Sequence, residues 1–361
     1  MVKPIQDQGA EGSPDDLAPA PESPDASPAV AEVRPASIAE NANRARLIGL
    51  LHRRVRKLGP LVAKVLGERT PEAVHDLRVL TRRVQQTLTA LFAGSRYHRL
   101  RLINRTLRRS RRALGEWRNY DVVLERLARK RRQTRSAEKQ RAWALVIDSV
   151  RQHRQHEMRR ARRRLVRLDL FDLNDEVEAL LDAHSGISGG GATPREIVAA
   201  ARASWQTALS RAFEERRPEN VHAFRIETKR LRYRIELVRD LGVQDTAEPL
   251  KWLASLQEAL GGWHDRLELG RCIAQAVAAS ETLYDQPRLS MILLAELEKE
   301  QKLAAAEVDA LMREVSKSPR RKQFDAWAAH HEQASPPAAP QAPEPVAAAE
   351  PIPAEQPVPT E

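Results

Sequence analysis

The sequence has little of several residue types on which familiar kinds of site depend. Cys272 is its only cysteine, which excludes an internal disulfide and a zinc site built from cysteines. Aromatic residues make up 4% of its 361 residues, so few side chains are available to stack on nucleic-acid bases. No apolar run approaches the ~18 residues of a membrane span, and the acidic, proline-rich start does not resemble a signal peptide. We therefore expect a cytoplasmic protein that does not span a membrane.

The two ends of the chain differ from its middle in charge and in proline content. Residues 1–36 carry a net charge of −5 and seven prolines, and residues 333–361 carry −4 and nine prolines. Because the whole chain carries +11, residues 37–332 carry +20. Neither end offers much apolar surface to bury, so we predict two disordered tails. They are most simply solubilising; the alternatives are a docking motif, or an electrostatic shield that folds back onto the basic middle.

Helical periodicity dominates residues 37–332, where Ala, Leu, Arg and Glu are abundant and runs of β-branched residues are absent. The prolines in this region fall between the apolar stripes rather than within them. An all-α fold is therefore predicted. The stretch SGISGGGAT, residues 185–193, holds four glycines and interrupts the pattern. It divides the region into halves of about 37–184 and 194–332.

Two motifs occur once in each half at nearly the same separation. PEAVHDLRVLTRR begins at Pro71 and returns as PENVHAFRIETKR from Pro218, 147 positions later. ALGEWRNYD begins at Ala113 and returns as ALGGWHDRL from Ala259, 146 positions later. The matching offsets indicate an internal duplication. Two similar helical units usually pack around an approximate twofold axis, which would turn the repeated motifs toward a common space.

The first motif predicts a helix with one basic and one apolar face. Thr70 and Pro71 are of the types preferred at the N-cap and at the first helical position, and Pro218 recurs without a capping hydroxyl before it. At about 100° per residue, the basic face holds His75, Arg78 and Arg82 in the first copy, flanked by Arg83, and His222, Arg225, Lys229, Arg232 and Tyr233 in the second, flanked by Arg230. The opposite stripe holds Leu77, Thr81, Val84 and Leu88, then Phe224, Thr228, Leu231 and Ile235.

A row of like charges destabilises an isolated helix by a few tenths of a kcal/mol per pair, and we expect no acid at a matching spacing to offset this row. Such a row is ordinarily a solvated face. Its presence in both halves of a strongly basic region favours a polyanionic ligand instead. Arginine, lysine and a histidine in the first turns of a helix suit phosphate oxygens. The scarcity of aromatics disfavours base stacking, so a ligand made of phosphate alone fits best.

The repeated segments resemble a known family. VHDLRVLTRR and VHAFRIETKRLRY, each followed about forty residues later by LG and an Asp-bearing segment, are similar to the CHAD domain over residues of about 40–330. The resemblance implies two helical bundles related by a pseudo-twofold axis, with a basic central groove or pore that binds inorganic polyphosphate. Carried over position by position, it assigns that binding to His75, Arg78, Arg82, Arg83, His222, Arg225, Lys229, Arg230 and Arg232. Gln85 makes the first copy less basic, and Asn119 stands where the family commonly has Asp.

Other basic residues are candidates to extend such a surface. In the arginine-rich segment 99–112 these are Arg105, Arg108, Arg109 and Arg112, and Arg234 is the candidate in the second half. The segment RQHRQHEMRRARRRLVR, residues 151–167, is an exposed basic helix, an extension of a polyanion track, or a nucleic-acid-binding helix. Trp117 and Trp263 stand at matching positions of the second motif, and we expect both in the core.

We expect a binding protein without catalysis, metal or cofactor. Polyphosphate hydrolysis would need carboxylates that converge on Mg²⁺, and the acids near the repeated motif do not share one helical face. Histidines ringed by arginines repel a cation, and Asp121 and Asp265 are expected to cap helices or orient arginines. CHAD domains are often joined to a triphosphate-tunnel phosphohydrolase with a Glu-x-Glu-x-Lys signature, which we expect to be absent here.

The sequence therefore predicts a cytoplasmic, non-catalytic polyphosphate-binding protein, with polyphosphate granules as a candidate location. Two alternatives stay open. One is a basic protein associated with nucleic acid. The other is a scaffold whose tails bring a granule or an enzyme to polyphosphate.

Overall fold

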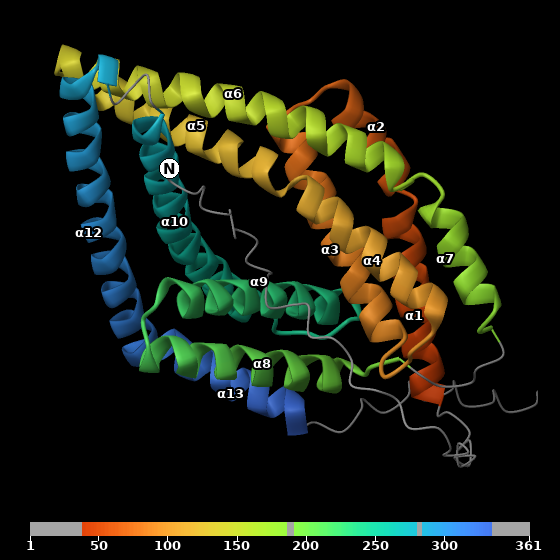
Figure 1. The fold of residues 1–361 in the computed structure, drawn as a ribbon. Helices are drawn as coiled ribbons and strands as arrows, with labels where there is room; N and C mark the ends of the chain where they lie inside the picture. Colours follow the sequence, from red (N-terminus) through yellow and green to blue (C-terminus); the bar gives the residue numbers. More distant parts are fainter. Residues whose placement is uncertain (1–37, 186–190, 280–283, 334–361) are drawn as a thin grey trace, which may run out of the picture. The chain divides into compact units, whose positions relative to one another are not determined.

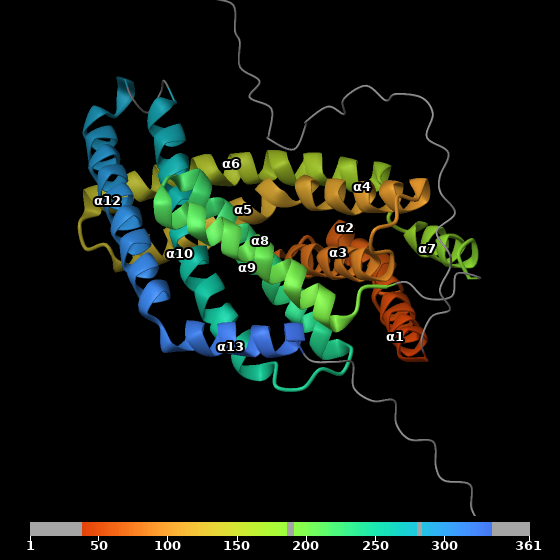
Figure 2. The ribbon, with the colours of Figure 1, turned by 90° about the horizontal axis from the view of Figure 1, so that it is seen from below.

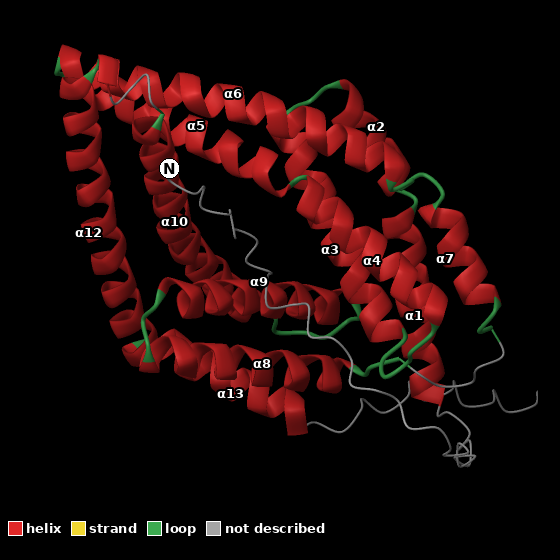
Figure 3. Cartoon of the chain, viewed as in Figure 1, coloured by secondary structure: helices red, strands yellow, loops and turns green. Residues whose placement is uncertain are grey.

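The computed structural model describes residues 38–185, 191–279 and 284–333. Within these ranges Figure 3 shows helices joined by loops and turns, with no strand. The predicted all-α fold is thereby confirmed. The tails predicted at 1–36 and 333–361 lie outside the described residues, apart from Gln333, which is the last residue of a helix. Most of the glycine-rich stretch 185–193 also lies outside them.

The helices follow one another with short connections (Figure 1). Those before the glycine-rich stretch are α1 (Ile38–Val55), α2 (Leu58–Gly67), α3 (Pro71–Leu91), α4 (His98–Ala113), α5 (Gly115–Gln133), α6 (Ala137–Arg167) and α7 (Leu173–Asp182). Those after it are α8 (Pro194–Glu214), α9 (Pro218–Asp240), α10 (Ala247–Ala278), α12 (Pro287–Lys317) and α13 (Pro319–Gln333).

The two copies of the first repeated motif form the helices α3 and α9, and both begin as predicted. The Thr70 hydroxyl accepts a hydrogen bond from the backbone N–H of Ala73 at 3.3 Å, and Pro71 is the first helical residue. At α9, Pro218 follows Arg217, which makes no side-chain cap. The predicted apolar stripes are fully buried in both helices, at Leu77, Thr81, Val84, Leu88, Phe224, Thr228, Leu231 and Ile235. The opposite, basic faces are therefore fixed in direction by burial of these stripes.

Helix contacts recur at matching places before and after the glycine-rich stretch. The helix α5 packs against α6, and the C-terminal part of α10 packs against α12. The contact of α4 with α7 corresponds in the same way to that of α10 with α13. Figure 2 shows α4 beside α6 and α10 beside α12. In the first half, a turn at Leu114 separates α4 from α5. At the equivalent position of the second half, Leu260, the long helix α10 continues without a break.

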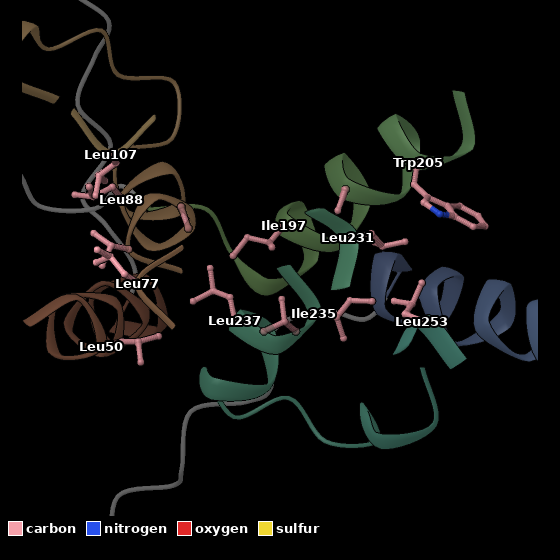
Figure 4. Packing of buried hydrophobic residues seen from close by; sticks show 14 of the residues in the cluster. Leu50, Leu77, Leu88, Leu107, Ile197, Trp205, Leu231, Ile235, Leu237 and Leu253 are labelled. Carbon is pink, nitrogen blue, oxygen red and sulfur yellow. The ribbon is translucent and has the colours of Figure 1, made fainter. Parts of the chain in front are cut away.

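One hydrophobic core spans both sequence halves. Figure 4 shows Leu77, Leu88 and Leu107 from the first half and Leu231, Ile235 and Leu253 from the second in the same cluster. Both Trp117 and Trp263 belong to this cluster, as predicted. A second cluster joins α5 and α6 to α10 and α12 through the residues Tyr120, Trp143, Cys272 and Leu293. Because the halves share a core, α3 and α9 are held in direct contact.

Candidate functional site

Four basic side chains from the two repeated helices come together where α3 and α9 meet. They are Arg78 and Arg82 of α3 and Arg225 and Lys229 of α9, here called the cation cluster. The charges of Arg82 and Arg225 lie close enough to Arg78 to lower its pKa, and those of Arg225, Arg82 and Arg78 all lower the pKa of Lys229. The basic faces of the two repeats therefore meet in one place.

Nearby acids offset the positive charge of the cation cluster only in part: the charge of Asp265 acts on Arg225 and Lys229 without forming an ion pair with them. Within the described part of the chain, none of its four members makes an ion pair. The Arg78 Nη1 donates to the backbone carbonyl of Arg111 at 2.6 Å, and the Arg82 guanidinium lies over the ring of Tyr233, 5.4 Å from its centroid. The Nε of Arg225 is buried without a hydrogen-bond partner among the described residues. An anion with several oxygens would supply these missing partners.

Burial and mutual repulsion lower the pKa of the cations in the cluster. Burial is the main cause for Arg78, whose pKa falls to about 10, and the charges of Arg82 and Arg118 add to it. The same causes lower the pKa of Lys229 to about 7, with Arg225 as the strongest neighbouring charge. Near neutral pH the arginines remain charged, whereas Lys229 stands at its titration midpoint.

The two predicted histidines lie beside the cluster, in the first turns of their helices. His75 is exposed, and partial desolvation, followed by the charge of Arg118, lowers its pKa. For His222, burial acts first and Arg225 second. Both side chains are therefore mainly neutral at pH 7, when each imidazole still has one N–H to donate to an oxyanion.

Sequence reasoning missed three residues of this region: Arg111 on α4, Arg118 on α5 and His264 on α10. Arg111 donates to the backbone carbonyl of Thr81 at 3.2 Å and to the side chain of Gln85. Burial together with Arg82 and Arg78 lowers the pKa of Arg111 to about 9. The predicted candidates on the same helix, Arg105, Arg108, Arg109 and Arg112, are exposed instead.

The other two missed residues had a signal in the sequence. Arg118 and His264 occupy matching positions of the second repeated motif, 146 residues apart. The His264 ring centroid lies 5.3 Å from that of His222, and burial with the charge of Arg225 lowers the pKa of His264 to about 3. Comparing the two copies position by position would have placed both residues beside the cluster.

The expectation that no acid offsets the basic row is wrong, because Glu236 lies on that face of α9. Its carboxylate is buried and accepts from Arg83 Nη2 at 2.9 Å and from Arg232 Nε at 3.1 Å. At about 100° per residue from His222, Glu236 falls near 320°, inside the basic stripe. Glu236 therefore links α3 to α9 and occupies two of the predicted binding residues in an ion-pair network.

Two further predicted residues also have partners. Arg230 pairs with Glu227 at the surface, and Arg234 Nε donates to Gln86 Oε1 at 3.2 Å. A binding role for Arg83, Arg230, Arg232 and Arg234 stays a prediction.

Replacing Glu236 by Gln should lower the free energy of unfolding by about 2 kcal/mol, because two partly buried arginines lose their shared carboxylate. The matched control is Glu227→Gln, which breaks the surface pair with Arg230 and should cost less than about 1 kcal/mol. Urea denaturation measures both. Equal effects of the two changes would show that Glu236 is not a structural link.

Asp121 is one of the two acids expected to cap helices or to orient arginines. It is buried and accepts from Arg154 Nε, in line with the expected orienting role.

The Glu-x-Glu-x-Lys spacing, which we expected to be absent, does occur at Glu298, Glu300 and Lys302. All three lie on α12, where side chains two positions apart point about 200° away from each other. Glu300 is buried between Lys130 and Arg266, so these two carboxylates do not converge.

The best-formed cavity lies apart from the cation cluster, and neither a metal site nor a membrane-spanning helix is found in the described residues. A cavity of about 620 Å³ is lined by α5 and α6 residues, among them Leu124, Arg131 and Ile147, and by no member of the cluster. No three His, Cys, Asp or Glu side chains of the described residues gather in a way that could hold a metal ion. In the same described ranges, no helix is both long and apolar enough to cross a membrane.

Comparison with known proteins relates this chain to one family. The family model described as CHAD domain matches residues 49–274, a range that contains the cation cluster. The fold resembles the crystal structure of the CHAD domain from the plant Ricinus communis, with a TM-score of 0.50, 20% identity, and coverage of 87% of this chain and 98% of that one. It also resembles PptA from Streptomyces chartreusis, with a TM-score of 0.54, 17% identity, and coverage of 75% and 99%. No curated protein matches the chain.

Proposed function

Because this chain belongs to the CHAD domain family, we propose that its cation cluster binds inorganic polyphosphate without catalysing its breakdown. One observation carries the proposal: cations from both repeated helices meet, half-buried, with no acid paired to them among the described residues. The free protein bears the cost of that repulsion, and a polyanion would relieve it. The matching helix contacts support the further proposal of two duplicated bundles around a basic central groove.

The geometry favours a slim phosphate chain over a nucleic acid. The cluster lies where α3 and α9 pack together, and Arg78 and Lys229 are partly buried. The one aromatic side chain on the basic face, Tyr233, is 9% exposed and lies beneath the guanidinium of Arg82. It therefore offers no open surface on which a base could stack. Arginine guanidinium groups bind phosphate oxygens in a bidentate manner and do not require a base.

Salt dependence and competition test this assignment. Calorimetric titration with long-chain polyphosphate should give a log K that falls linearly with log salt, and the four contacts of the cation cluster should contribute about −3 to the slope. Duplex DNA at equal phosphate concentration should not displace it. Displacement by DNA would favour the alternative, a basic protein associated with nucleic acid.

The absence of catalysis is tested separately, by incubating the protein with polyphosphate and Mg²⁺ and following phosphate release. We expect release to stay at the rate without protein. The scaffold alternative makes a different prediction, which is that deleting 1–36 and 333–361 changes the position of the protein at cytoplasmic polyphosphate granules while its affinity stays the same.

A further inference from the structure

A second basic surface lies on the outer sides of α4 and α6. The two helices pack against each other, and Figure 2 shows them side by side. Exposed arginines line both of them: Arg101, Arg105, Arg108 and Arg109 on α4, and Arg159, Arg163, Arg164 and Arg167 on α6. These eight residues are here called the outer arginine surface. None of the eight forms an ion pair with a carboxylate in the described part of the chain.

The outer arginine surface concentrates positive charge in a way that is unfavourable for its helices. The helix α4 contains no acidic residue, and the only acid in residues 151–167 is Glu157, which is engaged by Arg160 and His156. The arginines stand three and four positions apart, where like charges repel along a helix. On both helices this stripe lies opposite the buried side chains, so packing does not explain it.

The outer arginine surface connects to the cation cluster through α4. The charge of Arg108 acts on Arg111, which donates to the backbone of α3 at Thr81, beside Arg82. The arginines of α6 join this surface because α6 packs against α4.

We propose that the outer arginine surface binds the part of a long polyphosphate chain that extends beyond the cation cluster, so that the protein prefers long chains to short ones. This inference rests on the proposed function of the cluster. A chain anchored by the cluster presents its next phosphates to nearby arginines at high effective concentration. We expect a duplex nucleic acid to contact the outer surface only, because the side chains of the cluster are partly buried.

The test compares two ligands, tripolyphosphate and long-chain polyphosphate, with the full chain. The outer variant is Arg101→Gln/Arg159→Gln/Arg163→Gln/Arg167→Gln, because glutamine keeps a helix propensity close to that of arginine. The cluster variant is Arg78→Gln/Arg82→Gln/Arg225→Gln/Lys229→Met. The control replaces four exposed arginines on other helices, Arg195, Arg211, Arg313 and Arg320, by glutamine and removes the same charge.

We expect the outer variant to bind tripolyphosphate like the wild type and to lose at least about tenfold in affinity for the long chain, with a salt slope shallower by about 3. The control should lose much less. An equal loss in the control, or an equal loss for both ligands, would overturn the inference. So would an outer variant that loses binding to duplex DNA but keeps long-chain affinity. If the cluster variant binds both phosphates like the wild type, the proposed function itself fails.

Discussion

Neutralising the cation cluster should abolish polyphosphate binding and, at the same time, stabilise the free protein. In Arg78→Gln/Arg82→Gln/Arg225→Gln/Lys229→Met, affinity for long-chain polyphosphate should fall at least about a thousandfold, because each charged hydrogen bond to phosphate contributes roughly 1.5–3 kcal/mol. The free energy of unfolding should rise by about 1 to 3 kcal/mol, since partly buried like charges without acidic partners are removed. Calorimetry and urea denaturation measure the two effects.

The two measured effects distinguish a structural cluster from a ligand-binding site. A cluster that exists only to hold α3 against α9 would lose stability when it is changed, and a ligand site would lose affinity. Replacing Arg195, Arg211, Arg313 and Arg320 serves as the control for the change in net charge. If the cluster variant both unfolds more easily and keeps its affinity, the repeated basic faces are structural, and the exposed helix at 151–167 becomes the next candidate.

Much of this arrangement could be predicted from periodicity. The apolar stripes of α3 and α9 were assigned residue by residue, because a 3.6-residue period fixes which side chains share a face. The N-cap at Thr70 followed from its position before Pro71. Both depend on local sequence alone, and the structure confirms both.

What periodicity does not give is the partner of each face. The internal duplication led us to expect that the repeated motifs share a common space, but periodicity could not show that α3 contacts α9, because this contact depends on a core assembled from residues far apart in the chain. Glu236 stood on the basic stripe, yet only the tertiary contact shows that it serves Arg83 as well as Arg232. On α4, the arginine-rich sequence led us to select the exposed arginines as candidates. Arg111, on the partly buried side beside Leu107, is the arginine that donates to the backbone of α3.

Polyphosphate binding should take up protons, through Lys229. In the free protein burial and the charges of Arg225, Arg82 and Arg78 lower the pKa of Lys229 from 10.5 to about 7. A bound polyanion favours the charged ammonium and raises that pKa again. Above pH 7, binding should therefore consume close to one proton, and affinity should fall by up to about tenfold per pH unit until the pKa of the bound state is reached.

Other titrating groups lie near Lys229. Asp265 is the acid whose charge raises the pKa of Lys229, and burial raises the pKa of Asp265 itself above the usual value of an aspartate. The pKa values of His75 and His222 are lowered from 6.5, so these side chains take up protons only in more acidic solution. Calorimetry in two buffers of different ionisation enthalpy counts the protons, and uptake near pH 8 that persists in Lys229→Met would assign it to another group.

The same pKa predicts how the stability of the free protein depends on pH. Because the unfolded chain holds the Lys229 proton up to about pH 10.5 and the folded protein only to about pH 7, the unfolded state binds more protons between these values. The free energy of unfolding contributed by Lys229 therefore rises with pH across this window and is lowest below it. Lys229→Met should be more stable than the wild type near pH 7, and the difference should shrink as the pH approaches 10. A difference that stays constant with pH would mean that Lys229 keeps an ordinary pKa in the folded protein, and proton uptake on binding would then have to come from elsewhere.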